Sequence, residues 1–266
     1  MDVSHDTCCH EAMRTAFALL AVLIAVPACA FADDVRDFAP NRPSRSDSPY
    51  TVPPGLVQFE SDFANYTTDG DVLQALDPTV IFGLTHLSDI EFSLGGLVAQ
   101  KNNADTTTGF GDVVVRLKLN LVGDDSGPVT IAAIPYVKIP TAREPIGNGQ
   151  VEGGVNLPCL FALPYGFGLT IEPEISVLKD ALTDGKQASF TGIVNVAHTI
   201  AGTLSGFIEI YDQTYTDSAT RGPNTTFDFG VAYLVTKFIQ LDAGANVGLN
   251  RVTPGVNVYS GVAFRF

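Results

Sequence analysis

The sequence predicts an all-β chain that folds as a single antiparallel transmembrane β-barrel of about twelve strands. Two patterns predict this fold: apolar and polar residues alternate along most segments, and short connections alternate with longer polar ones. The alternation is clearest over residues 113–121, where valines and leucines alternate with a set that includes Arg116 and Lys118. A helix with this sequence would carry both cations into its apolar surface, so the period of two favours a strand.

An apolar run over residues 16–32 follows Arg14 and ends in small residues, a pattern typical of a secretory signal. We therefore expect residues 1–32 to be a signal peptide that is cleaved near Ala32, with the true start at Met13. The run is shorter than the roughly 20 apolar residues that an inner-membrane helix needs.

Residues 33–55 are rich in proline and serine and have no apolar period, which predicts a periplasmic N-terminal segment rather than a strand. The barrel is expected to occupy residues 56–266. Its predicted strands cover 56–66, 72–84, 90–99, 110–122, 129–140, 154–163, 167–178, 188–199, 203–211, 225–235, 239–249 and 256–266.

The predicted connections at 86–89, 164–166, 200–202 and 236–238 are short, whereas those at 100–109, 141–153, 179–187 and 212–224 are longer and polar. Short periplasmic turns and long outer loops are typical of bacterial outer-membrane barrels. A secreted β-sandwich, which is the alternative fold, has no reason for this regularity.

The last predicted strand resembles the closing strand of an outer-membrane barrel, in which a polar residue, a glycine and two aromatic residues recur at the spacing of Tyr259, Gly261, Phe264 and Phe266. The resemblance implies that these four residues are an assembly signal read by the barrel-assembly machinery. The last strand of a secreted sandwich is the alternative interpretation.

Charge and composition exclude several classes of function. The formal net charge of −14 argues against a nucleic-acid partner. After the leader, Cys159 is the only cysteine, and the two histidines, His86 and His198, fall near predicted turns without a nucleophile beside them. The sequence therefore predicts no enzyme, no catalytic residue, no metal site and no cofactor.

The chain after the leader resembles the outer-membrane β-barrel transporter family of the meta-pathway of phenol degradation. The resemblance rests on NRPSRSDSPYTVPPGLVQFE from residue 41, GFGDVVVRLKLNL at 109–121, VKIPTA at 137–142, LDAGANVGLN at 241–250 and the closing GVAFRF. It implies a bacterial outer-membrane location in contact with lipid. It also implies passage of small solutes, among them aromatic or other apolar compounds.

The polar positions of the strands are expected to line the lumen of the barrel. Nine acids and four bases occupy these positions: Glu60, Asp62, Glu91, Asp112, Glu172, Glu174, Glu209, Asp228 and Asp242, with Arg116, Lys118, Lys138 and Arg265. An open pore with this lining should prefer cations. A barrel enzyme acting on lipid or envelope substrates and a plugged structural barrel stay open as alternatives, as do the solute and the oligomeric state.

Overall fold

The computed structural model describes residues 36–102, 105–123, 127–180, 185–216 and 222–266, so the predicted signal peptide lies outside the described residues. The strands are β1 (Val57–Thr67), β2 (Val72–Ala75), β3 (Pro78–Thr85), β4 (Ser88–Ser93), β5 (Leu97–Asn102), β6 (Asp105–Phe110), β7 (Val113–Val122), β8 (Val129–Ile139), β9 (Glu152–Asn156), β10 (Cys159–Ala162), β11 (Phe167–Lys179), β12 (Lys186–Ala201), β13 (Leu204–Tyr215), β14 (Asn224–Thr236), β15 (Ile239–Gly248) and β16 (Val256–Arg265). The described helical structure is one short 3-10 turn at Pro164–Gly166. No described helix is long and apolar enough to cross a membrane.

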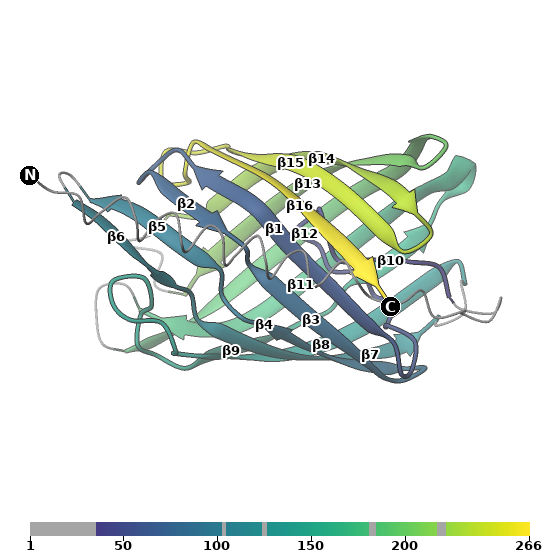
Figure 1. Ribbon diagram of the computed structural model, residues 1–266, viewed down its shortest axis with the longest axis horizontal. Coiled ribbons are helices and arrows are strands. Elements are labelled where there is room, and N and C mark those ends of the chain that lie inside the picture. Colours follow the sequence, from purple (N-terminus) through teal and green to yellow (C-terminus); the bar gives the residue numbers. More distant parts are fainter. Residues whose placement is uncertain (1–35, 103–104, 124–126, 181–184, 217–221) are drawn as a thin grey trace, which may run out of the picture. The chain divides into compact units, whose positions relative to one another are not determined.

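These strands form a closed antiparallel barrel whose wall is made of 12 membrane-crossing spans. Closure joins the first strand to the last, because β1 pairs β16 with Gln58 opposite Arg265 and Thr67 opposite Asn257. Figure 1 shows this seam, with β16 beside β1. Every strand of a barrel in hydrocarbon needs two neighbours for its backbone groups, and closure supplies the missing ones. The predicted fold class is confirmed.

Three of the predicted strands, at 72–84, 90–99 and 154–163, are each divided in two by a break in the ladder, and another break separates β6 from β7 at the start of the predicted strand 110–122. Three of these breaks lie on neighbouring spans, at Leu76–Asp77, Leu94–Gly96 and Gly111–Asp112. The backbone N–H of Gly96 donates to Asp77 Oδ1 at 2.9 Å, and the N–H of Gly111 donates to Gly96 O at 3.0 Å. Hydrogen bonds therefore connect the breaks of these three neighbouring spans. The fourth break falls at Pro158, which cannot donate to the ladder.

The two faces of the wall have the polarity that a bilayer requires. Along β12 Ser189 and Thr191 are buried. Phe190, which lies between them, is 53% exposed, and Val194, further along the same face as Phe190, is 47% exposed. The same alternation follows β14, where Asp228 is buried and Phe227 and Phe229 are exposed. A soluble sheet would bury the aromatic residues instead, so the exposed apolar face is the one suited to lipid.

The connections differ between the two ends of the barrel, but the long loop predicted at 100–109 is wrong, because most of these residues belong to β5 and β6, which pair with each other. Short turns follow β3, β10, β12 and β14, and they define the short-turn end. Longer connections at 140–151 and 249–255 lie at the opposite end, here called the long-loop end.

Candidate functional site

The N-terminal segment, residues 36–55, folds into the interior of the barrel as a loop whose two ends lie together. Thr51 Oγ1 and Arg36 Nη2 both donate to the carbonyl of His86 in the turn after β3, at 2.9 and 3.3 Å. Arg36 Nη1 also donates to Thr51 Oγ1 at 2.9 Å. The segment therefore enters from the short-turn end, reaches inward and returns to the same end before β1 begins.

Four carboxylates of the barrel wall accept the backbone N–H groups of this segment. Glu60 on β1 accepts from residues 41 and 42 at 3.1 and 3.2 Å, and Glu209 on β13 accepts from residues 45 and 46 at 3.0 and 3.1 Å. Glu172 on β11 accepts from residue 47 at 2.7 Å, and Asp89 on β4 accepts from residue 52 at 2.8 Å. These strands lie on different sides of the ring, so the segment must lie within it. A segment without secondary structure needs such partners for its buried amides.

Arg42 joins the segment to the seam of the barrel. Its Nη1 forms an ion pair with Asp62 on β1, and its Nη2 and Nε donate to the two oxygens of Asp242 on β15 at 2.7 and 3.2 Å. Burial alone would lower the pKa of the Arg42 guanidinium, but the ion pairs with Asp242 and Asp62 raise that pKa above its usual value. The guanidinium stays charged and bridges both strands that flank β16.

Two residues of β16 shape the place where Arg42 lies. A methyl group at Gly261 would collide with the Arg42 guanidinium and with the carbonyl of Ser61, so glycine leaves the space that this arginine needs. Tyr259 donates its hydroxyl to the carbonyl of Pro43 at 2.8 Å. Gly261 and Tyr259, which the sequence assigned to an assembly signal, thus also contact the N-terminal segment. Phe264 of the same predicted signal stacks on Phe59 at a ring-centroid distance of 4.9 Å.

Asp47 connects the segment to the opposite part of the wall. It forms an ion pair with Arg116 on β7 and accepts a hydrogen bond from Asn156 Nδ2 at 2.9 Å. Burial alone would raise the pKa of Asp47, yet the positive charges of Arg116 and Lys118 hold it below its usual value. The carboxylate of Asp47 is therefore kept ionised by the wall.

The thirteen predicted lumen residues all have partners on the segment or on neighbouring strands. Glu60, Asp62, Glu172, Glu209, Asp242 and Arg116 contact the segment as described above, and Asp228 pairs with Arg45 at 3.4 Å. Glu91 pairs with Arg116 and Lys118, at 3.5 and 3.1 Å. Lys138 pairs with Asp112 at 3.0 Å, and Glu174 accepts the Tyr136 hydroxyl at 2.7 Å. Arg265 donates to the carbonyls of residues 36 and 37 at 2.6 and 3.3 Å. Their role in lining an open pore stays a prediction.

The sequence did not identify the residues that carry the docking, above all Arg42, Arg45 and Asp47. The composition of residues 33–55 predicted a periplasmic N-terminal segment. The contacts instead place residues 41–52 inside the barrel. A signal was nevertheless present, because nine interior acids against four bases leave carboxylates that need donors from elsewhere in the chain. The arginines and backbone amides of the segment supply them.

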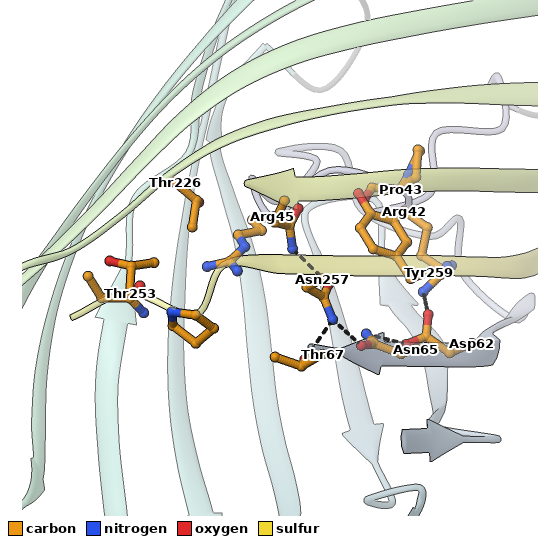
Figure 2. A pocket seen from close by; sticks show the side chains of 13 residues that line it. Arg42, Pro43, Arg45, Asp62, Asn65, Thr67, Thr226, Thr253, Asn257 and Tyr259 are labelled. Atoms are coloured by element: carbon orange, nitrogen blue, oxygen red, sulfur yellow. Dashed lines mark hydrogen bonds and ion pairs between the residues drawn. The ribbon is translucent and has the colours of Figure 1, made fainter. Parts of the chain in front are cut away.

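Cavities lie on either side of the segment. The largest of these has a volume of about 330 Å³ and lies toward the long-loop end, between Arg42, Arg45 and the first residues of β14 and β16 (Figure 2). A second, of about 240 Å³, lies between residues 39–50 and strands β10–β13. The interior thus holds cavities on both sides of the docked segment. The described residues contain no cluster of three His, Cys, Asp or Glu side chains placed to hold a metal ion.

Comparison with known proteins identifies the family of this chain. Residues 40–266 match the model of the family described as "Putative MetA-pathway of phenol degradation". The chain belongs to this family. The resemblance seen in the sequence is thereby confirmed. No curated protein matches this chain.

Solved structures share the fold at low sequence identity. An outer membrane channel from Pseudomonas putida F1 is 14% identical with a TM-score of 0.57, and the match covers 84% of this chain and 99% of that one. The NanC porin is 9% identical with a TM-score of 0.55, covering 78% of this chain and 98% of the porin. The KdgM porin, solved in complex with disordered oligogalacturonate, is 9% identical with a TM-score of 0.53, covering 79% and 99%. At these identities the comparison establishes the fold alone.

Proposed function

We propose that this protein is an outer-membrane channel that passes small solutes and whose lumen is closed by residues 36–55. The observation that carries the proposal is the way the segment is held. Its anchors are ion pairs and hydrogen bonds between polar groups, such as Arg42 with Asp242, and they leave cavities on both sides. A segment that filled the lumen permanently would be expected to pack through apolar side chains, because such a barrel needs no path for water or solutes.

The two faces of the wall support the proposed location. Apolar side chains cover its outer face, and a closed ladder leaves no unpaired edge at the β1–β16 seam. We place the chain in the bacterial outer membrane, in contact with lipid, after export and cleavage of the leader near Ala32. The last strand, with Phe264 and Phe266, is proposed to be what the barrel-assembly machinery reads.

The solutes are proposed to include small aromatic compounds, which the description of the family supports. The cavity beside Arg42 and Arg45 has polar and aromatic walls that suit hydroxylated rings better than purely apolar ones. A plugged structural barrel is the second candidate, and the docked segment is the observation in its favour.

Single-channel recording of the purified protein in planar bilayers tests the proposal. A channel closed by a docked segment should show brief openings, and these should become more frequent when a substitution removes contacts between the segment and the wall. A structural barrel should stay silent in every variant. Uptake of aromatic compounds by a deletion strain, with and without the restored protein, then tests whether solutes enter through it. Equal uptake by both strains would contradict the proposed aromatic solutes.

A further inference from the structure

The largest cavity beside the N-terminal segment presents cationic side chains to a solute. Its volume of about 330 Å³ lies within the range of small-molecule sites, which is about 300–1,000 Å³. The charged side chains of its lining are Arg42, Arg45 and Asp62, so it holds two guanidinium groups and one carboxylate. Its other lining residues are uncharged asparagines, threonines, prolines and a tyrosine. This cavity therefore differs from the predicted lumen lining as a whole, in which acids outnumber bases.

The accessible charges at this cavity are mainly the positive ones. The side chains of Arg45 and Arg42 are 31% and 17% exposed, whereas that of Asp62 is 9% exposed. The other carboxylates that pair with these arginines, Asp242 and Asp228, are 0% exposed and do not line the cavity. A solute that enters the cavity therefore meets guanidinium groups more readily than carboxylates.

Arg45 keeps hydrogen-bond donors for a ligand. Arg42 already directs all three of its guanidinium nitrogens at wall carboxylates. Arg45 contacts Asp228 through Nε, at 3.4 Å, and among the residues that the structure describes no acceptor is found for its Nη1 and Nη2 groups. In Figure 2 its guanidinium extends away from Arg42, toward the side of the cavity where Thr226 and Thr253 lie. The free donors thus belong to the more exposed of the two arginines.

The surroundings of Arg45 hold its guanidinium in place. Its Cζ lies over the Tyr211 ring, 4.3 Å from the centroid, and its backbone N–H donates to Glu209 at 3.0 Å. Because the side chain is already ordered, binding a ligand costs it little further freedom. The terminal N–H groups of a guanidinium form a planar fork that matches the two oxygens of a carboxylate.

The rest of the lining suits a small flat body. The ring of Tyr259 and the faces of Pro43 and Pro254 supply apolar surface within the same cavity. Tyr259 is itself held, because its hydroxyl donates to the carbonyl of Pro43 at 2.8 Å. A ring that lies against these surfaces adds contact area to the charge interaction with Arg45.

We propose that this cavity binds a small aromatic carboxylate, whose two oxygens accept hydrogen bonds from Nη1 and Nη2 of Arg45. Arg42 adds a second positive charge to the site. The inference rests on the proposed channel function and narrows its solute class to aromatic acids. It is compatible with an open pore that prefers cations, because that preference comes from carboxylates along the whole lumen and the binding from the charges of one cavity.

Isothermal titration calorimetry on the full, detergent-purified protein at neutral pH tests the inference with three probes. Benzoate carries a carboxylate on a flat ring, benzamide keeps this shape without the charge, and sulfate is an anion of different geometry. Benzoate should bind, and benzamide and sulfate should bind at least about tenfold more weakly, the size of one lost hydrogen bond to a charged group. Absence of benzoate binding, or an affinity for benzamide or sulfate equal to that for benzoate, would overturn the inference.

Variants assign the binding to the cavity. Arg45→Gln should weaken benzoate binding roughly 10- to 100-fold, because it removes the hydrogen bonds to a charged ligand. Arg45→Lys keeps the charge but lacks the planar fork, so its affinity should lie between those of Arg45→Gln and the wild type. Arg143→Gln, on an exposed residue of the loop at 140–151, is the matched control and should leave the affinity unchanged.

Asp228 needs a control of its own, because Arg45→Gln leaves this buried carboxylate without its cation. The double variant Arg45→Gln with Asp228→Asn removes both charges and should bind benzoate as weakly as Arg45→Gln alone. Wild-type affinity in the double variant would show that the unpaired Asp228 caused the loss, and it would refute the role of Arg45.

The outcome is separable from that of the channel proposal, because binding in detergent requires no transport. A protein that conducts but does not bind benzoate contradicts the site alone. A protein that binds benzoate and stays silent in bilayers, even when contacts between the segment and the wall are removed, contradicts the channel alone.

Discussion

Removing the Arg42 side chain should release the tip of the N-terminal segment. Arg42→Ala removes the ion pair with Asp62 and both hydrogen bonds to Asp242. It also leaves two carboxylates facing the interior without their cation. The remaining contacts of the segment, such as that of Asp47 with Arg116, are untouched, so the barrel itself should still form.

The size of the effect follows from burial. The side chains of Arg42, Asp62 and Asp242 are 17%, 9% and 0% exposed, so these pairs are little screened by solvent. Removing one partner of a buried charge pair costs about 3–5 kcal/mol. At about 1.4 kcal/mol per factor of ten, the ratio of undocked to docked tip should rise roughly 100- to 4,000-fold.

Planar-bilayer recordings measure this ratio as the fraction of time spent open. Arg42→Ala should show frequent or sustained openings, and Asp242→Asn, which removes one of the two partners, a smaller increase. Arg143→Ala, an exposed arginine in the loop at 140–151, is the control and should match the wild type. Detergent gels check that each variant forms its barrel, because an intact barrel migrates differently before and after boiling. If both Arg42→Ala and Asp242→Asn form the barrel and give the same recordings as the wild type, the role of these ion pairs is refuted.

Three further changes test other parts of the structure. Gly261→Ala should displace the Arg42 guanidinium and the Ser61 carbonyl and raise the open fraction at least tenfold in the same recordings; closed traces would contradict the steric argument. Changing Phe264 and Phe266 to Ser should sharply lower the yield in outer-membrane fractions without lowering synthesis, and normal yield would count against the assembly signal. In reversal-potential measurements across a salt gradient, an opened Arg42→Ala channel should prefer cations, and adding Glu172→Gln with Glu174→Gln should weaken that preference; anion selectivity would exclude the predicted lining.

The strands and their faces could be predicted because a period of two is a local property that closure does not change. Phe190 and Val194 stand on the outer face of β12 as their spacing requires. The breaks were harder to predict, because they are held by contacts between neighbouring spans, such as that of Gly96 with Asp77. Glycines at 95, 96 and 111 were the only local sign of them.

The docked segment could not be predicted from its own pattern. Residues 36–55 have no hydrogen-bonding ladder and no apolar period, and their partners lie on strands scattered along the chain. The excess of acids on the inner face was the available clue, since buried carboxylates need donors. Gly261 illustrates a further limit, because an added methyl group would meet the Arg42 guanidinium and the Ser61 carbonyl, which belong to other parts of the chain.

The position of the segment at the start of the chain has a consequence for the order of assembly. Its contacts with β1 form between residues about 20 positions apart, but the bond from Arg42 to Asp242 spans 200 positions and that from Tyr259 to Pro43 spans 216. Contacts of such long range cannot form before the last strands are in place, and their loop-closure entropy makes them slow. Docking should therefore begin at β1 and finish only after the seam with β16 has closed. A newly inserted barrel would then pass through a stage in which its interior is still open to water.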